Sequence, residues 1–287
     1  MITGAGGFLG SQLVKRLNTE KNYDLFTDRI DLLDPRELKS AINEIKPDVV
    51  FHLASYVNLS RDFLTAKKCI DANINGTLNL LEALRNCPPS KFIFTSTEEV
   101  YNGASIPFSE NQTLDPPSPY SVSKIASEYL CKLYTKELDF SLIIFRLATF
   151  YGPENPTHRL IPQIIINALN NNDILLNSGE KKRDYLYVND AVDALEKAIK
   201  KTQKEKIEII NLGGGKLYTL RDLVNKVMAI TNSKSKIIYD AYPDRVMEAD
   251  EWLLDIKKAE KILGWKPKTT LDEGLQNTIA YFKANYL

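Results

Sequence analysis

The chain has 287 residues, and its 37 lysines and arginines are balanced by 37 aspartates and glutamates. Zero net charge gives no reason to expect a nucleic-acid or anionic-membrane partner, and the apolar runs are only strand-length, which predicts neither a membrane span nor a signal peptide. Two histidines cannot form a histidine-rich metal site, and three cysteines without metal or redox spacing predict reduced thiols in the cytoplasm.

Strands and helices alternate through the first half of the sequence. Repeated βα units of this kind predict an α/β fold, namely a Rossmann-type, doubly wound parallel sheet with right-handed crossovers. His52, at the end of an apolar strand, is interpreted as a packing residue. The first strand is short for the centre of such a sheet, which favours additional residues before Met1. In chain order, strands are predicted at residues 1–3, 23–27, 48–53, 91–95 and 141–147, and helices at 8–17, 35–45, 69–85 and 120–138.

The pattern is less regular after residue 151. Helices are predicted at residues 159–170, 190–200, 220–230 and 271–286, with short strands between them. We expect residues 1–150 to form one domain and residues 151–287 to form mainly a smaller lobe that covers its cleft. Parts of 177–215 are expected to return to the first domain.

A glycine loop opens the chain. Gly4, Gly7 and Gly10 have G-x-x-G-x-x-G spacing, directly after the first predicted strand and before the first predicted helix. This context is typical of a dinucleotide site, where the chain turns tightly and a helix N-terminus meets the pyrophosphate. The alternative is a glycine turn without a ligand.

Acidic residues follow the second predicted strand. Asp28 stands 18 residues after Gly10, where a carboxylate accepts hydrogen bonds from adenosine ribose and repels a 2′-phosphate, so NAD is favoured over NADP. Arg29 leaves NADP open because it could bind a 2′-phosphate instead. Asp34 could contact adenine or cap the helix that begins with Pro35.

Tyr120 and Lys124 are spaced to share one face of a helix. An ammonium beside a phenol favours the phenolate, so we expect Lys124 to lower the tyrosine pKa and let Tyr120 take a proton from a hydroxyl group at neutral pH. Alone, the pair is typical of a solvated helix face. With the glycine loop and the Ser/Thr run at 95–97, it indicates hydride transfer to a dinucleotide.

The ordered set of motifs resembles the extended short-chain dehydrogenases/reductases that remodel nucleotide sugars. The resemblance covers nearly the whole chain, and it implies that residues 1–150 bind the dinucleotide and that 151–287 mainly bind the nucleotide sugar. The motifs are TGAGGFLG (3–10), FHLAS (51–55), NINGT (73–77), FTSTEEVY (94–101), YSVSK (120–124), YGP (151–153), RDY (183–185) and LGWKP (263–267).

The resemblance implies roles for single residues. Tyr120 would be the acid/base at the sugar C4 hydroxyl, with Thr97 bonded to the same oxygen, and Lys124 would bind the nicotinamide ribose. Asn73 would steady the loop that lines the nicotinamide. The implied cofactor-binding set is Gly4, Gly7, Phe8, Leu9, Gly10, Asp28, Arg29, Asp34, Leu53, Ala54, Ser55, Asn73, Tyr120 and Lys124.

Substrate contacts are implied in the second half. Arg183 and Arg245 resemble the arginines that grip the diphosphate, a task suited to a planar bidentate cation. The alternative to this role is that both arginines lie on the surface in contact with solvent. Thr149 stands where the family usually has Asn, so the implied substrate contact departs from the family pattern at this position.

Glu98 and Glu99 bear on which C4 reaction follows. In the family's 4,6-dehydratases, an Asp donates a proton at C6 and a Glu removes the C5 proton, and Glu98 replaces that Asp here. The pair could also be strand-end residues turned to solvent. The function favoured is an epimerase or 4,6-dehydratase. The run at 28–34 favours instead an NADPH-dependent 4-keto-deoxysugar reductase, and a non-catalytic dinucleotide-binding scaffold or sensor is the alternative from another class.

The expected partners are a nucleotide diphosphate sugar as substrate and a second copy of the chain. The helices at 69–85 and 120–138 resemble those with which the family forms a four-helix dimer seam. The nucleotide and the sugar are left open, because no pattern in the second half separates one base from another.

Overall fold

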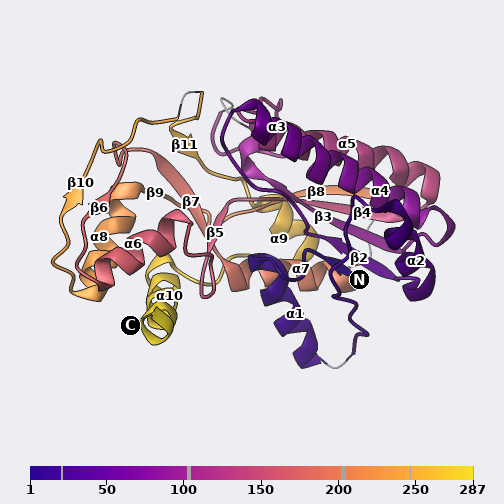
Figure 1. Cartoon of the computed structure of the whole chain (residues 1–287), viewed down its shortest axis with the longest axis horizontal. Helices are drawn as coiled ribbons and strands as arrows, with labels where there is room; N and C mark the ends of the chain where they lie inside the picture. The colour runs from indigo at the N-terminus through magenta and orange to yellow at the C-terminus, as the bar shows by residue number, and fades with distance from the viewer. Residues whose placement is uncertain (21, 102–104, 202–204, 246, 287) are drawn as a thin grey trace.

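A five-stranded parallel sheet organises the first domain of the computed structural model, which describes residues 1–20, 22–101, 105–201, 205–245 and 247–286 (Figure 1). The predicted parallel, Rossmann-type sheet is therefore confirmed, and its last strand comes from beyond residue 151. In order across the sheet, the strands are β1 (Ile2–Thr3), β2 (Val49–His52), β3 (Lys91–Thr97), β4 (Ser141–Leu147) and β8 (Ile207–Leu212).

Helices cover both faces of this sheet. One face carries α1 (Phe8–Glu20), α7 (Val188–Lys200) and α9 (Lys257–Leu263). The other carries α2 (Pro35–Ile45), α3 (Phe63–Cys69), α4 (Gly76–Ala83) and α5 (Pro119–Leu138).

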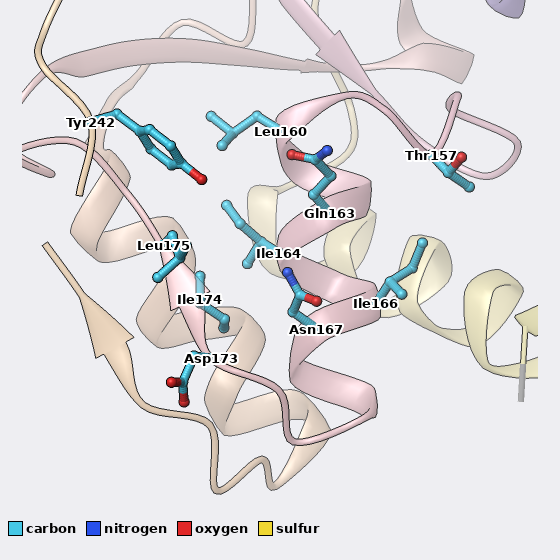
Figure 2. Close-up of a pocket in the computed structure, with 10 residues that line it drawn as sticks. All are labelled: Thr157, Leu160, Gln163, Ile164, Ile166, Asn167, Asp173, Ile174, Leu175 and Tyr242. Atoms are coloured by element: carbon cyan, nitrogen blue, oxygen red, sulfur yellow. The ribbon is translucent and has the colours of Figure 1, made fainter.

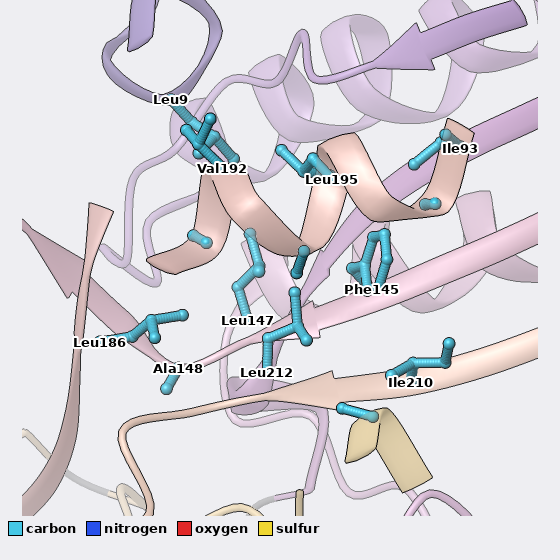
Figure 3. Close-up of a cluster of buried hydrophobic side chains, with 14 of the residues drawn as sticks. Leu9, Ile93, Phe145, Leu147, Ala148, Leu186, Val192, Leu195, Ile210 and Leu212 are labelled. Atoms are coloured by element: carbon cyan, nitrogen blue, oxygen red, sulfur yellow. The ribbon is translucent and has the colours of Figure 1, made fainter. Parts of the chain in front are cut away.

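The strands are apolar on both sides because both faces are covered. In β3, Ile93 belongs to the buried cluster under α7 (Figure 3), whereas Phe92 and Phe94 belong to the cluster under α2, α4 and α5. In β4, Phe145 belongs to the cluster under α7, and Ile144 belongs to the cluster under α2, α4 and α5. This period of two gives the sheet two separate layers of core.

A second lobe is built from the later part of the chain and lies at the left of Figure 1. Its helices share a third buried cluster, separate from the two that flank the main sheet. They are α6 (Leu160–Leu169), α8 (Leu220–Thr231) and α10 (Leu271–Tyr286). Its strands are β5 (Thr149–Tyr151), β6 (Ile174–Leu175), β7 (Lys182–Tyr187), β9 (Leu217–Thr219), β10 (Ile237–Ile238) and β11 (Glu251–Trp252).

Two predicted elements differ in the structure. Residues 23–27 form no regular strand; Ile2 N donates to Phe26 O at 2.9 Å, and β1 is therefore the last regular strand at its edge of the sheet. The helix predicted at 69–85 is part of a longer helical run that begins with α3 and continues through a π-helical turn η1 (Ile70–Asn75), α4 and a 3₁₀ turn η2 (Leu84–Asn86). Within the π turn, the Asn73 side chain hydrogen-bonds to the neighbouring loop at Tyr56.

Helix caps fix where two important helices begin. Asp34 accepts hydrogen bonds from Arg36 N and Glu37 N at the start of α2, as the capping alternative predicted. Ser118 and Ser121 form a capping box at the start of α5, which places Tyr120 in the first turn of that helix. In the ranges that the structure describes, no helix combines the length and the apolar character needed to cross a membrane.

Candidate functional site

The glycine loop runs from β1 into the N-terminus of α1. Gly4 has a φ of 74°, and a Cβ there would lie 2.6 Å from Ala54 N, so only glycine fits between the two loops. Gly6 and Gly7 are exposed immediately before Phe8, where α1 begins. The first turn of α1 has no acidic residue, so its amide groups and dipole are available to an anion. This loop fits the pyrophosphate of a dinucleotide.

Asn73 joins this region to α5. Its Oδ1 accepts from Tyr56 N at 2.7 Å and from Ser55 Oγ at 3.1 Å, while its Nδ2 donates to Ser123 Oγ at 2.8 Å. Asn73 is only 2% exposed. The predicted cofactor residues Ala54 and Ser55 are therefore held between the glycine loop and the helix that carries Tyr120.

Other predicted cofactor residues lie around the same edge. Phe8 stacks on Phe150 with ring centroids 5.6 Å apart, and Leu9 is buried in the core below. Asp28 and Arg29 are exposed in the irregular segment that follows residue 27. Asp34 has its carboxylate engaged as a helix cap, which limits what else that group can bind.

Tyr120 and Lys124 are both buried, and their electrostatics differ from the sequence prediction. Burial and the charge of Glu99 raise the Tyr120 pKa well above its ordinary value, although the charge of Arg159 opposes the rise. Burial lowers the Lys124 pKa to about 8, and its ammonium lies 4.1 Å from the centre of the Phe94 ring. The expected lowering of the tyrosine pKa is therefore wrong for the protein by itself, because desolvation dominates.

Glu98 and Glu99 follow β3 in the 3₁₀ turn η3 (Glu98–Tyr101), and both are buried, so the solvent-facing alternative is wrong. Glu98 Oε1 accepts from Thr149 N at 2.8 Å and from Thr149 Oγ1 at 3.0 Å. Burial and the charge of Asp184 raise the Glu98 pKa well above its ordinary value. Thr149 therefore hydrogen-bonds to Glu98, in addition to the substrate contact that the resemblance implies.

Glu99 lies closer to the predicted reacting centre. Its charge acts on Tyr120, and burial raises its own pKa against the opposing effects of Ser118 and Arg245. Its backbone N donates to Thr97 Oγ1 at 3.3 Å. Glu99 thus contacts Thr97 at the carboxyl end of β3, where ligands bind in open parallel sheets, and its charge acts on Tyr120.

Arg183 and Arg245 meet at Glu248, so the solvated-surface alternative fails for Arg183. Glu248 Oε1 lies 3.2 Å from Arg183 Nη2 and 3.7 Å from Arg245 Nη1, and Lys181 Nζ lies 3.4 Å from Oε2. The Arg183 guanidinium also stacks 4.5 Å from the centre of the Trp252 ring. Sequence reasoning missed Glu248 and Trp252; the Arg-x-x-Glu spacing at 245–248 is the signal that could have indicated the first.

A hollow of about 330 Å³ opens in the second lobe beside α6 (Figure 2). Apolar side chains such as Leu160 and Leu175 line it together with the amides of Gln163 and Asn167, and the Tyr242 ring stands at its rim. This mixture suits a flat, partly polar group. None of the residues that line the hollow belongs to β3, η3 or α5, the elements that carry Thr97, Glu99 and Tyr120.

A family model described as GDP-mannose 4,6 dehydratase matches residues 18–278. The chain belongs to this family. A putative UDP-glucose 4-epimerase from Methanocaldococcus jannaschii is 31% identical over 308 residues, which cover 99% of this chain and 98% of that protein. The dTDP-glucose 4,6-dehydratase of Salmonella typhimurium is 28% identical over 338 residues, which cover 99% of this chain and 92% of that protein.

Solved structures of similar proteins cover the chain equally well. The UDP-glucose 4-epimerase of Thermotoga maritima, solved with UDP-glucose, superposes with a TM-score of 0.92 at 28% identity and covers 100% of this chain and 99% of its own. The UDP-glucuronic acid 4-epimerase of Bacillus cereus, solved with UDP-glucuronic acid and NAD, has a TM-score of 0.90 at 27% identity, with 99% of each chain covered. RMD from Pseudomonas aeruginosa, solved with NADPH, has a TM-score of 0.90 at 25% identity and covers 99% of this chain and 98% of its own.

Membership of the GDP-mannose 4,6 dehydratase family confirms the class predicted from the motifs. The protein is an NAD-dependent enzyme of the nucleotide-sugar epimerase and dehydratase type, which works by hydride transfer at sugar C4. The individual site residues stay predictions, with positions that are now known.

Proposed function

We propose that this protein oxidises C4 of a nucleoside diphosphate hexose and then removes the C5 proton, as a 4,6-dehydratase does. The observation that carries the proposal is the buried Glu99 carboxyl, whose charge acts on Tyr120. A 4-epimerase needs one acid/base at the C4 hydroxyl. A second carboxyl with a raised pKa beside that tyrosine suits proton transfer at the neighbouring carbon.

The first step belongs to Tyr120. NAD⁺ supplies the hydride acceptor when bound, and its positive charge favours loss of the phenolic proton. The ionised Tyr120 then accepts the O4 proton while C4 is oxidised to a ketone, and Thr97 donates a hydrogen bond to the same oxygen. Lys124, one helical turn from Tyr120, would hold the ribose hydroxyl groups of the cofactor.

The second step belongs to the two glutamates. The new C4 ketone makes the C5 hydrogen acidic, and Glu99 removes it as a proton. Glu98, whose pKa burial raises well above its ordinary value, donates a proton to the C6 hydroxyl, which leaves as water. A hydride returned to C6 and a proton returned to C5 then give a 4-keto-6-deoxy sugar.

The two arginines bind the diphosphate in this proposal. Arg183 and Arg245 with Lys181 carry three positive charges around the single carboxylate of Glu248, and the excess of two matches the two charges of a diphosphate diester. The hollow lined by Leu160 and Leu175 has the mixed apolar and amide character that suits the nucleotide base.

A 4-epimerase is the second candidate, because several similar solved structures are 4-epimerases. Incubation in D₂O distinguishes the dehydratase reaction from the epimerase reaction. Incubation with dTDP-glucose, UDP-glucose and GDP-mannose, followed by NMR, should give deuterium at C5 and a 4-keto-6-deoxy product from one of them. Inversion at C4 without deuterium at C5 would make the protein an epimerase, and turnover only of a 4-keto sugar with added NADPH would make it a reductase.

Glu99→Gln gives the matched test of the second step. This variant should still oxidise C4 in a single turnover, seen as NADH absorbance, but should lose deuterium exchange at C5. Glu137→Gln is the control, because Glu137 is an exposed glutamate near the far end of α5. Normal exchange by Glu99→Gln would show that another group removes the proton.

We also propose that two copies of the chain pair through α5 and through the helical run that begins with α3 and continues over the predicted helix at 69–85. Phe63 and Leu64 on α3 are 89% and 62% exposed, and Tyr129 and Leu133 on α5 are 61% and 60% exposed. α3 packs against α5. We call these four exposed apolar side chains together the α3/α5 face. A second copy is the occupant proposed, because the resemblance of this chain to its family implies a seam of four helices.

The cytoplasmic location expected from the sequence is kept as a proposal. Cys69, Cys87 and Cys131 are all free in the structure. Unpaired thiols are typical of a reducing compartment. Recovery of the protein in the soluble cytoplasmic fraction of its host, judged by immunoblot, is the measurement that checks it.

A further inference from the structure

A chain of hydrogen bonds centred on His52 runs beneath the glycine loop. His52 ends β2 and is 1% exposed. Its Nδ1 lies 2.7 Å from Thr3 Oγ1, and its Nε2 lies 2.9 Å from Thr77 Oγ1. The ring packs against Phe92 and Phe94, as expected for a packing residue, and both of its nitrogens are engaged as well.

The direction of every bond in this chain follows from one contact. Thr77 Oγ1 donates its single hydrogen to the Asn73 carbonyl oxygen at 2.5 Å, so toward His52 it can only accept. The ring proton must then sit on Nε2, which leaves Nδ1 as an acceptor for the Thr3 hydroxyl. Thr3 Oγ1 in turn accepts from Ala54 N at 3.4 Å.

The two ends of the chain lie on the loops that the cofactor requires. Thr3 immediately precedes Gly4, and Ala54 N is the atom that a Cβ at Gly4 would approach to 2.6 Å. At the other end, Asn73 holds Ser55 through its side chain. A neutral imidazole with one defined tautomer thus ties the glycine loop to the turn that carries Asn73.

We propose that His52 is a positioning residue for the dinucleotide: its Nε2–H tautomer sets the spacing between the Gly4 loop and the Ala54–Ser55 segment. The inference rests on the proposed function, because that function needs the dinucleotide in this place. His52 does not touch the reacting atoms. It acts through Thr3 and Thr77.

The tautomer is tested directly on the wild-type protein. Nitrogen-15 NMR of the imidazole should place the proton on Nε2 and leave Nδ1 with the shift of an unprotonated acceptor. This measurement needs no cofactor. A proton on Nδ1 would reverse the two hydrogen bonds that His52 makes and overturn the proposal.

The role in binding is tested by titrating NAD⁺ into variants. Asn places its amide near the position of Nδ1 and Gln near that of Nε2, so His52→Asn keeps the Thr3 contact and His52→Gln keeps the Thr77 contact. His52→Phe keeps neither. We expect the NAD⁺ dissociation constant to rise about tenfold or more in His52→Phe and by less in the other two variants.

Thr77 gives a milder test with a rescue, should His52→Phe fail to fold. Thr77→Val removes the hydroxyl at nearly constant volume and should weaken NAD⁺ binding by about threefold to tenfold, whereas Thr77→Ser should restore it. Thr278→Val is the matched control, because Thr278 is also fully buried and bonds the carbonyl four residues back, in α10 of the second lobe.

The outcomes distinguish the proposed function from the positioning role of His52. A wild-type protein that binds no NAD⁺ contradicts the proposed function, and the NMR assignment then decides the tautomer. Unchanged NAD⁺ affinity in a folded His52→Phe, or in Thr77→Val, overturns the positioning role. Equal weakening by Thr278→Val would mark the effect as a general loss of stability, which also counts against it.

Discussion

The Arg183 guanidinium and the Glu248 carboxylate form an ion pair of 3.2 Å, and the pair joins β7 to the segment before β11. Arg183 is held further by stacking on Trp252 and by hydrogen bonds to the Lys182 and Asp250 carbonyl oxygens. A guanidinium with this many fixed contacts is oriented before any substrate arrives, which lowers the entropy cost of binding an anion.

Arg183→Lys should therefore weaken substrate binding although the charge is kept. A lysine ammonium can reproduce neither the stacking on Trp252 nor the planar fork, so we expect the substrate dissociation constant to rise about 10- to 100-fold. Calorimetric titration with the nucleotide sugar measures it. Arg85→Lys is the control, since Arg85 forms an exposed pair with Glu137. Equal affinity of Arg183→Lys and Arg85→Lys for the nucleotide sugar would show that Arg183 does not bind the diphosphate.

Tyr120→Phe should abolish most of the turnover while NAD⁺ binding is kept. The phenol is the proposed acid/base at C4, and loss of such a group costs about 10²- to 10⁴-fold in rate. Steady-state turnover of the substrate found in the D₂O experiment is the measurement. Tyr129→Phe on the exposed side of the same helix should be unchanged. Turnover at the wild-type rate in Tyr120→Phe would mean that another group carries the proton.

Leu133→Glu should separate the proposed dimer. Leu133 is exposed on the α3/α5 face, and a buried carboxylate at a helix interface without a partner is strongly unfavourable. Light scattering at micromolar concentration should give the mass of a dimer for the wild type and of a monomer for Leu133→Glu. Ile238→Glu, an exposed apolar site on β10, should stay dimeric. A monomeric wild type would contradict the proposed pairing.

Glu128→Gln should destabilise the first domain. Glu128 accepts two hydrogen bonds from Arg146, at 2.9 Å from Nε and 2.7 Å from Nη2, and both residues are buried. Removing the carboxylate leaves a buried guanidinium without its anion, so the free energy of unfolding should fall by about 3–5 kcal/mol. Denaturant unfolding measures it. Glu137→Gln on the same helix should change it by about 0–1 kcal/mol, because that pair is exposed.

The neutral state of His52 makes a defined contribution to acid stability. Burial, together with the charge of Lys124, lowers the His52 pKa from 6.5 to about 3. A group whose folded pKa is depressed contributes stability above its unfolded pKa, and that stability is lost as pH falls. Below pH 6.5, His52 binds a proton in the unfolded chain but stays neutral in the folded chain. The free energy of unfolding therefore falls by about 1.4 kcal/mol per pH unit until pH 3 is approached.

His52→Gln should therefore show a shallower loss of unfolding free energy between pH 6 and pH 4 than the wild type, by about 2–3 kcal/mol over that window. Buried acids act in the opposite sense: the raised pKa values of Glu98, Glu99 and Asp184 favour the folded state as pH falls. The difference between wild type and variant cancels these shared contributions. Parallel pH profiles from urea unfolding would show that His52 does not remain neutral.

The amino-acid sequence by itself determined the features that depend on near neighbours. Alternating apolar runs predicted the parallel sheet, because a strand covered by helices on both faces must be apolar throughout. The spacing of Gly4, Gly7 and Gly10 predicted the loop before α1, and the spacing of Tyr120 and Lys124 placed them on one helix face. Family motifs then supplied the class of enzyme.

Only the tertiary structure decided how these groups behave. The Tyr120 pKa is raised because packing removes the phenol from water and brings Glu99 beside it, and neither effect is visible in a spacing of four residues. The buried Glu98 carboxyl accepts a hydrogen bond from Thr149 of β5, 51 positions away. His52 is oriented by threonines that lie 49 and 25 positions away along the chain. Desolvation and hydrogen bonds between distant segments exist only after folding, and they set the chemistry of the site.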